Sequence, residues 1–508
     1  MPGLLSAAGL AAGRNAVPGI KTISIEPKNQ LVFRITRLYA TVPKEFNGVK
    51  FRSIGIRCCV LAGLMFATVV HAATAAETTT HTNNFISQPI SIADAVNLAL
   101  QQNPSLRRAR KEIEAAQGVV IQTRAVLWPK LRLSGAYNAV EDSDVDKPPA
   151  NIPFTFGTDQ NWNAQFRVVQ SIYEGGRMTS ALRVGRLTEE RAMLDYQTAV
   201  ADTVAAVQIG YFDVLLAEQQ IQVQEASLEL LRHELTDAQR RFDAGTVPRF
   251  NVLRAEVEVA NAQPRLIRAQ NAFRIAKNYL ANLLALDTPR EAGDDIALRL
   301  SGRLEAEPYD LPMPKALARA LERRTELSSL RKAEALRVED IVNARSGYKP
   351  TFEAYAGYEA RSSLFTPDLT SDLHGWIAGV QLNWDLFDGR RTEGRIKEAR
   401  ARKDQAEIQV EDTGRRIELE VRTAFSNFRE ADEVLKSQQK VLEQADEALR
   451  LASARAGAGT ATQLDVLSAQ TALTEARNTQ IQALHDYAVA RARLERAVGD
   501  NVPNSGVR

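Results

Sequence analysis

The ten residues AGTVPRFNVL at 244–253 recur as AGTATQLDVL at 458–467, and the two copies are 214 residues apart. An upstream landmark repeats as well, because Pro129 is matched by Pro350. A long internal repeat of this kind predicts a duplicated architecture rather than one irregular domain. We therefore divide the chain into a first repeat at 77–290, a linker at 291–313, a second repeat at 314–500 and a tail at 501–508.

Each repeat contains a very long helical segment followed by a shorter one that returns. The long segments cover about 177–243 and 390–456, and the return segments about 251–286 and 465–498. A helix of the first length reaches ~100 Å at ~1.5 Å per residue, which no globular domain needs. Apolar residues, mostly Ala, Leu and Val, recur at intervals of three and four, so one seam faces a partner helix throughout. Each repeat is predicted to form an antiparallel coiled-coil hairpin.

Four segments, two in each repeat, change to the alternation of polar and apolar residues that β-strands show. They cover about 130–140, 161–173, 351–360 and 375–387, and helices of moderate length precede them at 104–126 and 314–346. Roughly ten residues is the length that a tilted strand needs to cross a bilayer. A soluble hairpin also alternates, but four segments of matching length favour membrane strands. The polar connections at 141–160 and 361–374 are expected to be external loops.

Aromatic residues stand near both ends of these four segments. On the side of the helices they are Trp128, Tyr173, Tyr348 and Phe387, and on the side of the loops they are Tyr137, Trp162, Tyr358 and Trp376. Aromatic rings suit the boundary between acyl chains and headgroups, so two such girdles indicate contact with membrane lipid. The alternative is the general enrichment of aromatic residues in strands.

Four strands are too few to close a barrel. Membrane barrels begin at about eight strands, and an open edge in lipid leaves backbone groups unpaired, at a cost on the order of several kcal/mol each. Chains must therefore pool their strands, and two, three or four chains would supply eight, twelve or sixteen. The spacing of the segments does not choose among these numbers. The helical hairpins of the same chains would continue the ring as a tube.

The segment 49–76 has the form of a secretory signal peptide, with basic residues, then an apolar run at 58–70, then small residues. That run is too short for a transmembrane helix. One hypothesis is that translation starts at Val49, which would make the extension 1–48 an artefact of the gene model. Both cysteines, Cys58 and Cys59, lie in the run, so the mature chain is expected to hold neither disulfides nor thiolate metal sites.

Charge and histidine content argue against several classes of function. Without residues 1–76 the chain carries 55 basic and 60 acidic side chains, a net charge of −5, which argues against nucleic acid as a partner. The histidines of the mature chain lack ligand spacing, and no pair of carboxylates stands out for acid–base chemistry. We therefore expect no metal, no cofactor and no enzymatic activity.

In this order and doubled, the features resemble the TolC-type outer membrane efflux and secretion channels over about residues 88–500. The motifs that carry the similarity are Asn103-Pro104-Ser105-Leu106, Phe387-Asp388-Gly389-Arg390 and the two repeated turns. The resemblance implies an α+β membrane protein of the cell outer membrane. It implies a homotrimer in which four strands per chain form a twelve-stranded transmembrane β-barrel above a long α-helical coiled-coil barrel in the periplasm. It also implies docking, tip to tip, with a periplasmic adaptor (membrane fusion) protein and an inner membrane transporter.

The resemblance assigns roles to residues of the two repeated turns. The residues expected to meet the adaptor are Gly245, Thr246, Leu253, Gly459, Thr460 and Leu467. In the family an acidic ring narrows the periplasmic entrance; Asp465 matches one of its acids, whereas Ser468 and Asn251 stand where others would be. We expect a weaker ring that still favours cations. The alternatives are simple helix termination for the turns and, for Asp465, stabilisation of a helix N-terminus.

The expected function is a passive exit duct of a tripartite efflux pump or a type I secretion system. It would export small molecules or proteins across the periplasm and the outer membrane. The alternative is a periplasmic adaptor or a structural coiled-coil protein, which also carries a long helical hairpin. An adaptor should have one hairpin beside a compact β domain, not two hairpins interleaved with strands of membrane length. The residues choose neither the cargo nor the pump.

Overall fold

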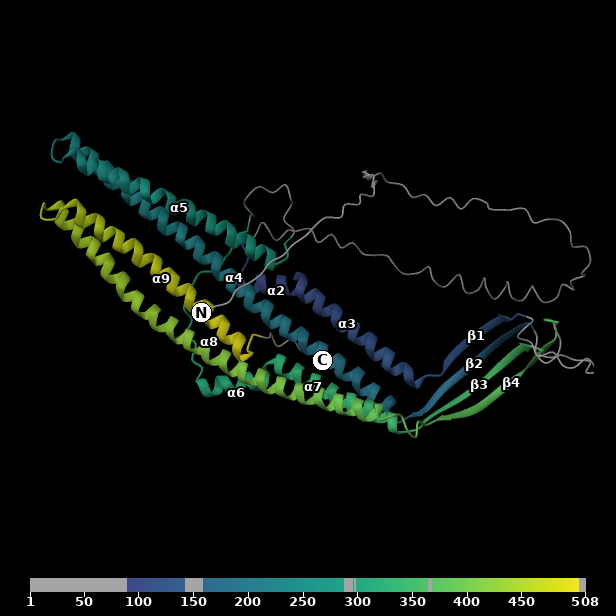
Figure 1. The fold of residues 1–508 in the computed structure, drawn as a ribbon. Coiled ribbons are helices and arrows are strands. Elements are labelled where there is room, and N and C mark those ends of the chain that lie inside the picture. Colours follow the sequence, from purple (N-terminus) through teal and green to yellow (C-terminus); the bar gives the residue numbers. More distant parts are fainter. Residues whose placement is uncertain (1–88, 142–158, 287–295, 297, 364–367, 502–508) are drawn as a thin grey trace, which may run out of the picture. The chain divides into compact units, whose positions relative to one another are not determined.

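The computed structural model describes residues 89–141, 159–286, 296, 298–363 and 368–501, so the expected extension and signal segment at 1–76 lie outside the described residues. The first repeat contains α2 Ile92–Gln102, α3 Pro104–Arg124, η2 Ala125–Leu127, β1 Lys130–Ala139, β2 Gln160–Glu174, α4 Arg177–Asp243 and α5 Arg249–Leu283. The second contains α6 Met313–Arg323, α7 Thr325–Arg345, η4 Ser346–Tyr348, β3 Thr351–Ser362, β4 Asp372–Asn383, α8 Arg391–Gly457 and α9 Gln463–Val498. Figure 1 shows α4 with α5 and α8 with α9 as two long hairpins.

The two repeats correspond element by element. α2 and α6 have 11 residues each, α3 and α7 have 21, and α4 and α8 have 67. The helices before the strands start 221 residues apart and the long helices after them start 214 apart, so the repeats differ in length only between those elements. Both long helices follow a residue in the left-handed region, Gly176 in one repeat and Arg390 in the other.

The four strands form one antiparallel sheet in the order β1-β2-β3-β4. Its register places the apolar side chains together on one face, and one row across this face consists of Leu133, Phe166, Tyr358 and Trp376. The adjacent row on the other face consists of Ser134, Gln165, Glu359 and Gly375. Leu133 and Trp376 are 82% and 84% exposed, so the apolar face is open. This is the arrangement that a strand with lipid on one side and water on the other requires.

The last strand differs from the expected range 375–387, because β4 begins at Asp372 and ends at Asn383. Asn383 is paired with Thr351, the first residue of β3. Pro350 precedes that residue and has no backbone N–H to extend the ladder, so Trp384 to Phe387 leave the sheet. The other strands differ from the expected bounds by at most two residues.

The helix expected at 314–346 is wrong as a single element, because it is divided into α6 and α7 at Arg324, where the backbone is extended with ψ 115. The corresponding break at Asn103 is visible in the sequence, since a residue before proline disfavours the helical conformation. In the second repeat the residue after Arg324 is Thr325 and not a proline, so the sequence does not mark this break. The return helices begin two residues before the expected starts, because Pro248 and Thr462 are their N-caps.

The long helices pack in two consecutive layers along the chain. Nearer the strands the neighbours are α3, α4, α7 and α8, and farther away they are α5, α4, α9 and α8, each helix packed against the next in that order. Within the hairpins the contacts are apolar. The largest cluster includes Val421, Phe428, Tyr487 and Leu494 from α8 and α9.

Candidate functional site

The two tip turns close their long helices in the same way. Gly245 has φ +73 and Gly459 has φ +75, in the left-handed region that favours glycine. The backbone N–H groups of Thr246 and Thr460 each donate to the carbonyl five residues earlier at 2.9 Å. Their hydroxyls donate to the same carbonyls at 2.8 and 3.1 Å. The Gly-Thr pairs therefore act as helix terminators, whatever else they bind.

The start of the return helix differs between the tips. In the second tip the backbone N–H and the hydroxyl of Thr462 both donate to Asp465 Oδ2 at 2.8 Å, and the Asp465 N–H donates to the Thr462 hydroxyl oxygen at 3.3 Å. This is a capping box. The hydrogen bonds from Thr462 lower the pKa of the Asp465 carboxyl, which is exposed and ionised. In the first tip Pro248 offers no side-chain cap, and Asn251 occupies the position of Asp465.

The two tips also differ in how much apolar surface they expose. Leu253 on α5 is 47% exposed, whereas its counterpart Leu467 on α9 is 7% exposed. The reason is position, because α9 lies between α8 and α4, while α5 packs extensively on α4 alone among the described helices. Ser468 is exposed and its hydroxyl donates to the Asp465 carbonyl at 3.0 Å. The predicted gate residues Asp465 and Ser468 therefore share one tip, and Asn251 belongs to the other.

The predicted aromatic girdle residues are largely on the surface of the chain. The exposed ones are Trp128, Tyr137, Tyr173, Tyr348, Tyr358, Trp376 and Phe387. Trp162 is half-buried, and its indole N–H donates to the Leu369 carbonyl at 3.0 Å. In the register of the sheet, Tyr137 is paired with Trp162 and Tyr358 is paired with Trp376. Because Tyr358 lies opposite Phe166 and not opposite Trp162, the two aromatic pairs are staggered along the strands, as strand tilt requires.

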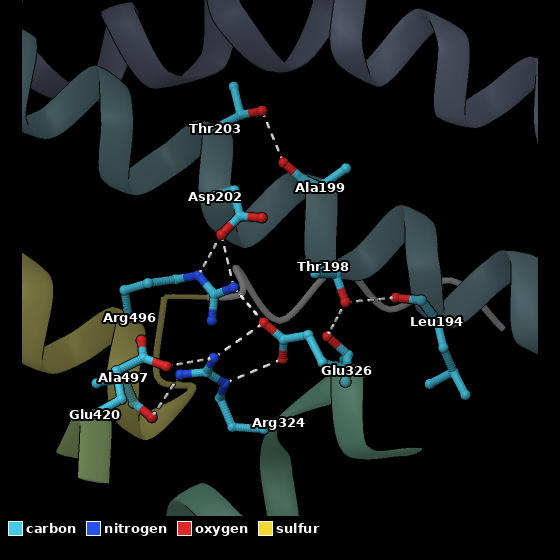
Figure 2. A network of polar contacts seen from close by, with 11 residues as sticks. Leu194, Thr198, Ala199, Asp202, Thr203, Arg324, Glu326, Glu420, Arg496 and Ala497 are labelled. Atoms are coloured by element: carbon cyan, nitrogen blue, oxygen red, sulfur yellow. Dashed lines mark hydrogen bonds and ion pairs between the residues drawn. The ribbon is translucent and has the colours of Figure 1, made fainter. Parts of the chain in front are cut away.

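A buried ionic network at the junction of α6 and α7 was not predicted from the sequence (Figure 2). The Arg324 guanidinium, 7% exposed, donates to Glu326 at 3.1 Å, to Glu420 at 2.9 Å and to the Ala497 carbonyl at 3.2 Å. Arg496 on α9 bonds the same Glu326 and donates to Asp202 on α4 at 2.7 Å. The network therefore joins the first repeat to three helices of the second.

Two further observations concern membrane contact and metals. One stretch of α4 is long and apolar enough to cross a membrane by length and composition, but 56% of it is buried against other helices. Among the described residues, no group of three or more His, Cys, Asp and Glu side chains is placed to hold a metal ion.

Comparisons with known proteins agree with this architecture. The family model "Outer membrane efflux protein" matches residues 95–286 and 316–500, which fall in the two structural repeats. Outer membrane protein TolC of Escherichia coli is 23% identical, over 82% of this chain and 83% of the relative. The cobalt-zinc-cadmium resistance protein CzcC of Cupriavidus metallidurans is 26% identical, over 81% and 90%.

The fold is shared with solved structures as well. The outer membrane protein VceC from Vibrio cholerae superposes with a TM-score of 0.67 at 19% identity, covering 80% of this chain and 96% of that one. Two hairpins interleaved with four strands also do not fit the alternative of a periplasmic adaptor with one hairpin. Because the family match spans both repeats and most of the chain, the chain belongs to the outer membrane efflux protein family.

Proposed function

We propose that three copies of this chain form a channel through the outer membrane and the periplasm, which serves as the passive exit duct of an inner membrane transporter. One observation carries the proposal: the described strands and long helices form a strip, in which the outermost elements of the sheet and of both helical layers have a neighbour on one side only. The strands run from β1 to β4, and the helices run from α3 to α8 and from α5 to α8. A strip of this kind is completed by rolling copies of itself into a ring.

The sheet gives the first support. Among the described strands, β1 and β4 are each paired on one side only. Backbone groups at such an edge need partners when the adjacent face lies in lipid. Pairing β4 of one copy with β1 of the next closes the sheet, and three copies supply twelve strands, a number within the range of membrane barrels.

The helical layers give the second support. The outer helices carry large exposed apolar residues away from the tips, which on α5 are Val257, Ile267, Ile275 and Tyr279, and on α8 are Ile408, Val441 and Leu451. Several large exposed apolar residues on one helix are typical of an interface. We infer that α5 of one copy packs against α8 of the next, which continues the closed ring below the membrane.

The tips are proposed to form the periplasmic entrance and the docking surface for an adaptor protein. Three exposed, ionised Asp465 carboxylates would form a negative ring that favours cations. The ring lacks further acids because Asn251 and Ser468 are uncharged. The exposed Phe250 and Leu253 beside Gly245 and Thr246 offer the apolar part of the docking surface.

The test of the duct is its mass and conductance. Protein purified in detergent should have the mass of three chains, should dissociate on heating, and should conduct ions in planar bilayers. A monomer that does not conduct would contradict the duct. The cargo is assigned to the transporter, because a wide passive duct selects weakly.

The test of the gate must separate charge from capping. Asp465→Asn keeps an oxygen that accepts from Thr462 and removes the charge, so the reversal potential should move toward zero. Glu112→Gln, an exposed acid on α3, is the matched control and should leave it unchanged. An unchanged reversal potential in Asp465→Asn would refute the gate and leave the duct intact.

A further inference from the structure

The two hairpins contact each other through α4 and α9. Ile481 and Leu484 of α9 pack against the apolar cluster that contains Val207 of α4, and four polar pairs accompany this apolar packing. These pairs, from the strand side toward the tips, are Asp202–Arg496 at 2.7 Å, Asp213–His485 at 2.8 Å, Gln224–Asn478 at 3.4 Å and Ser227–Thr474 at 3.3 Å. Asp202, Asp213 and Gln224 are spaced by 11 residues, as are Arg496, His485 and Thr474. Eleven residues make three helical turns, so these side chains recur on one face of each helix.

The strength of these pairs falls toward the tips. The pair nearest the strands joins a carboxylate to an arginine, which does not lose its proton in proteins. The two pairs nearest the tips join uncharged amides and hydroxyls at longer distances. Of the four pairs, Asp213–His485 is the one whose charge changes near neutral pH. It stands at the boundary between the ionic and the neutral part of the contact.

The geometry around His485 requires a charged imidazolium. Its Nε2 lies 2.8 Å from Asp213 Oδ1 on the first hairpin, and its Nδ1 lies 3.0 Å from Asp486 Oδ1 on its own helix. A carboxylate only accepts hydrogen bonds, and a neutral imidazole has one N–H to donate. Both contacts are satisfied together only when both ring nitrogens carry a proton.

The other charged side chains near His485 are of different chemical types. The imidazole lines a cavity of 960 Å³ between α4, α8 and α9, whose other charged side chains are Asp202, Arg416, Glu420, Glu430, Asp486, Arg493 and Arg496. These are carboxylates and guanidinium groups, and among the described residues His485 is the one imidazole that lines the cavity. Burial disfavours the charged imidazole, but the hydrogen bonds to Asp213 and Asp486 outweigh it and raise the pKa of His485.

We propose that His485 is a pH-sensitive clasp between the two hairpins, closed when the imidazole is protonated and loosened when it is neutral. Loosening spreads toward the tips, because the pairs on that side are neutral, whereas the strand side remains held by Asp202–Arg496 and the Arg324 network. The proposal extends the proposed duct, since a looser α4–α9 contact widens the periplasmic end at alkaline pH. A raised pKa means that the stabilisation is complete below about pH 6.5 and is lost as the pH rises through the folded value.

A distance measurement between the hairpins tests the clasp without requiring conduction. Spin labels on cysteines at the exposed positions Ala226 on α4 and Ala472 on α9 report the separation. The chain has no cysteine after residue 59, so the mature protein carries these labels alone. Labelled chains are diluted with unlabelled ones so that each assembly holds one pair. Between pH 5 and 9 the distance should lengthen, with a midpoint above 6.5.

Two substitutions at His485 should fix the distance between the hairpins at its two extremes. His485→Gln should hold the long distance at every pH, and His485→Lys, which is always charged in this range, should hold the short one. His233→Gln is the matched control, because this exposed histidine lies on α4 and faces Glu229 at 3.9 Å; it should keep the normal profile. A flat profile in the unsubstituted protein, or a pH-dependent distance that persists in His485→Gln, would overturn the clasp. Either result would leave the trimer mass and conductance of the duct untouched.

Discussion

In the first repeat the helices α2 and α3 meet at Asn103, and in the second α6 and α7 meet at Arg324. Both side chains donate to the same carbonyl position of their return helix, Asn103 to Leu283 at 2.8 Å and Arg324 to Ala497 at 3.2 Å. Arg324 also binds Glu326 and Glu420, which Asn103 has no means of doing. The duplicated position has kept its hydrogen bond and changed its charge.

The tips show the same division of work between the repeats. In the second tip the polar side chains of Thr462 and Asp465 cap α9, and Leu467 in the first turns of this helix is buried. In the first tip the side-chain cap is absent and Leu253 is exposed, while Phe250 and its counterpart Leu464 are exposed in both tips. At the junction and at the tip, the second repeat therefore has polar contacts that the first repeat lacks. The first repeat leaves its tip surface free for a neighbour.

The largest difference is expected at the junctions. Arg324→Ala leaves Glu420 without this partner and leaves Glu326 with Arg496 as its remaining arginine. Because Glu420 is half exposed, the cost should be about 3 kcal/mol, the lower end of the range for a buried pair. Asn103→Ala removes a neutral cap and one hydrogen bond, which costs about 1–2 kcal/mol. Thermal unfolding followed by the helical circular dichroism signal, in the same detergent for both variants, measures the two effects.

A matched variant refines this test. Arg324→Lys keeps the charge but not the forked donor geometry, so its stability should lie between that of the unsubstituted protein and that of Arg324→Ala. Equal losses from Arg324→Ala and Asn103→Ala would mean that the ionic part of the junction adds nothing to the shared hydrogen bond.

The next difference is expected at the leucines of the two tips. Leu467→Ala removes a buried side chain and should destabilise the protein by about 2–4 kcal/mol. Leu253→Ala removes one that is half exposed, and the loss should be about 1 kcal/mol or less in a single chain. Unfolding measurements on the monomer and the trimer compare them. If Leu253 is buried by a neighbouring copy, its substitution should cost more in the trimer.

The fold class was predictable from the sequence because helices and strands each produce a characteristic period of apolar residues. Strict alternation at 130–140 and 161–173 and a seam sustained over 177–243 each depend on local side-chain order. The register of the sheet was not predicted, and the structure supplies it. The predicted end of β4 was wrong because it depends on Pro350, which immediately precedes the neighbouring strand β3. The break at Arg324 was missed because its cause is tertiary: the side chain is held by Glu326, Glu420 and Ala497 from three helices.

The candidate site was predictable only in part, for a related reason. The tip glycines stood out because the turn needs their backbone conformation. The partners of His485 did not, since Asp213 lies 272 residues away and the spacing of the histidines carries no information about it. The opposite exposure of Leu253 and Leu467 was equally hidden, because the two residues have identical local sequence roles and differ in how many helices surround them.

A third effect, of intermediate size, is the change in stability when the pH is lowered. Burial disfavours the ionised Glu326, but the hydrogen bond from Arg496 and the charges of Arg496 and Arg324 outweigh it and lower the pKa of its carboxyl. Its contribution to stability is therefore present above about pH 4.5 and is lost as the pH falls through the folded value. Glu326→Gln should be less stable at pH 7 and should lose less on acidification. Glu322→Gln, an exposed neighbour on α6, should follow the unsubstituted profile.

The smallest effect is expected at the N-caps, where the comparison can be reversed by design. Thr462→Ala removes the cap of α9 at a cost of about 1 kcal/mol, and amide hydrogen exchange at 463–466 should become faster. Pro248→Thr gives α5 the cap that it lacks, and exchange at 249–252 should become slower. If exchange in Thr462→Ala stays unchanged, the Thr462 hydroxyl adds nothing to the cap, and the backbone N–H of residue 462 is the remaining donor to the Asp465 carboxylate. If exchange accelerates, capping and gating share one side chain, and Asp465→Asn is the substitution that separates them.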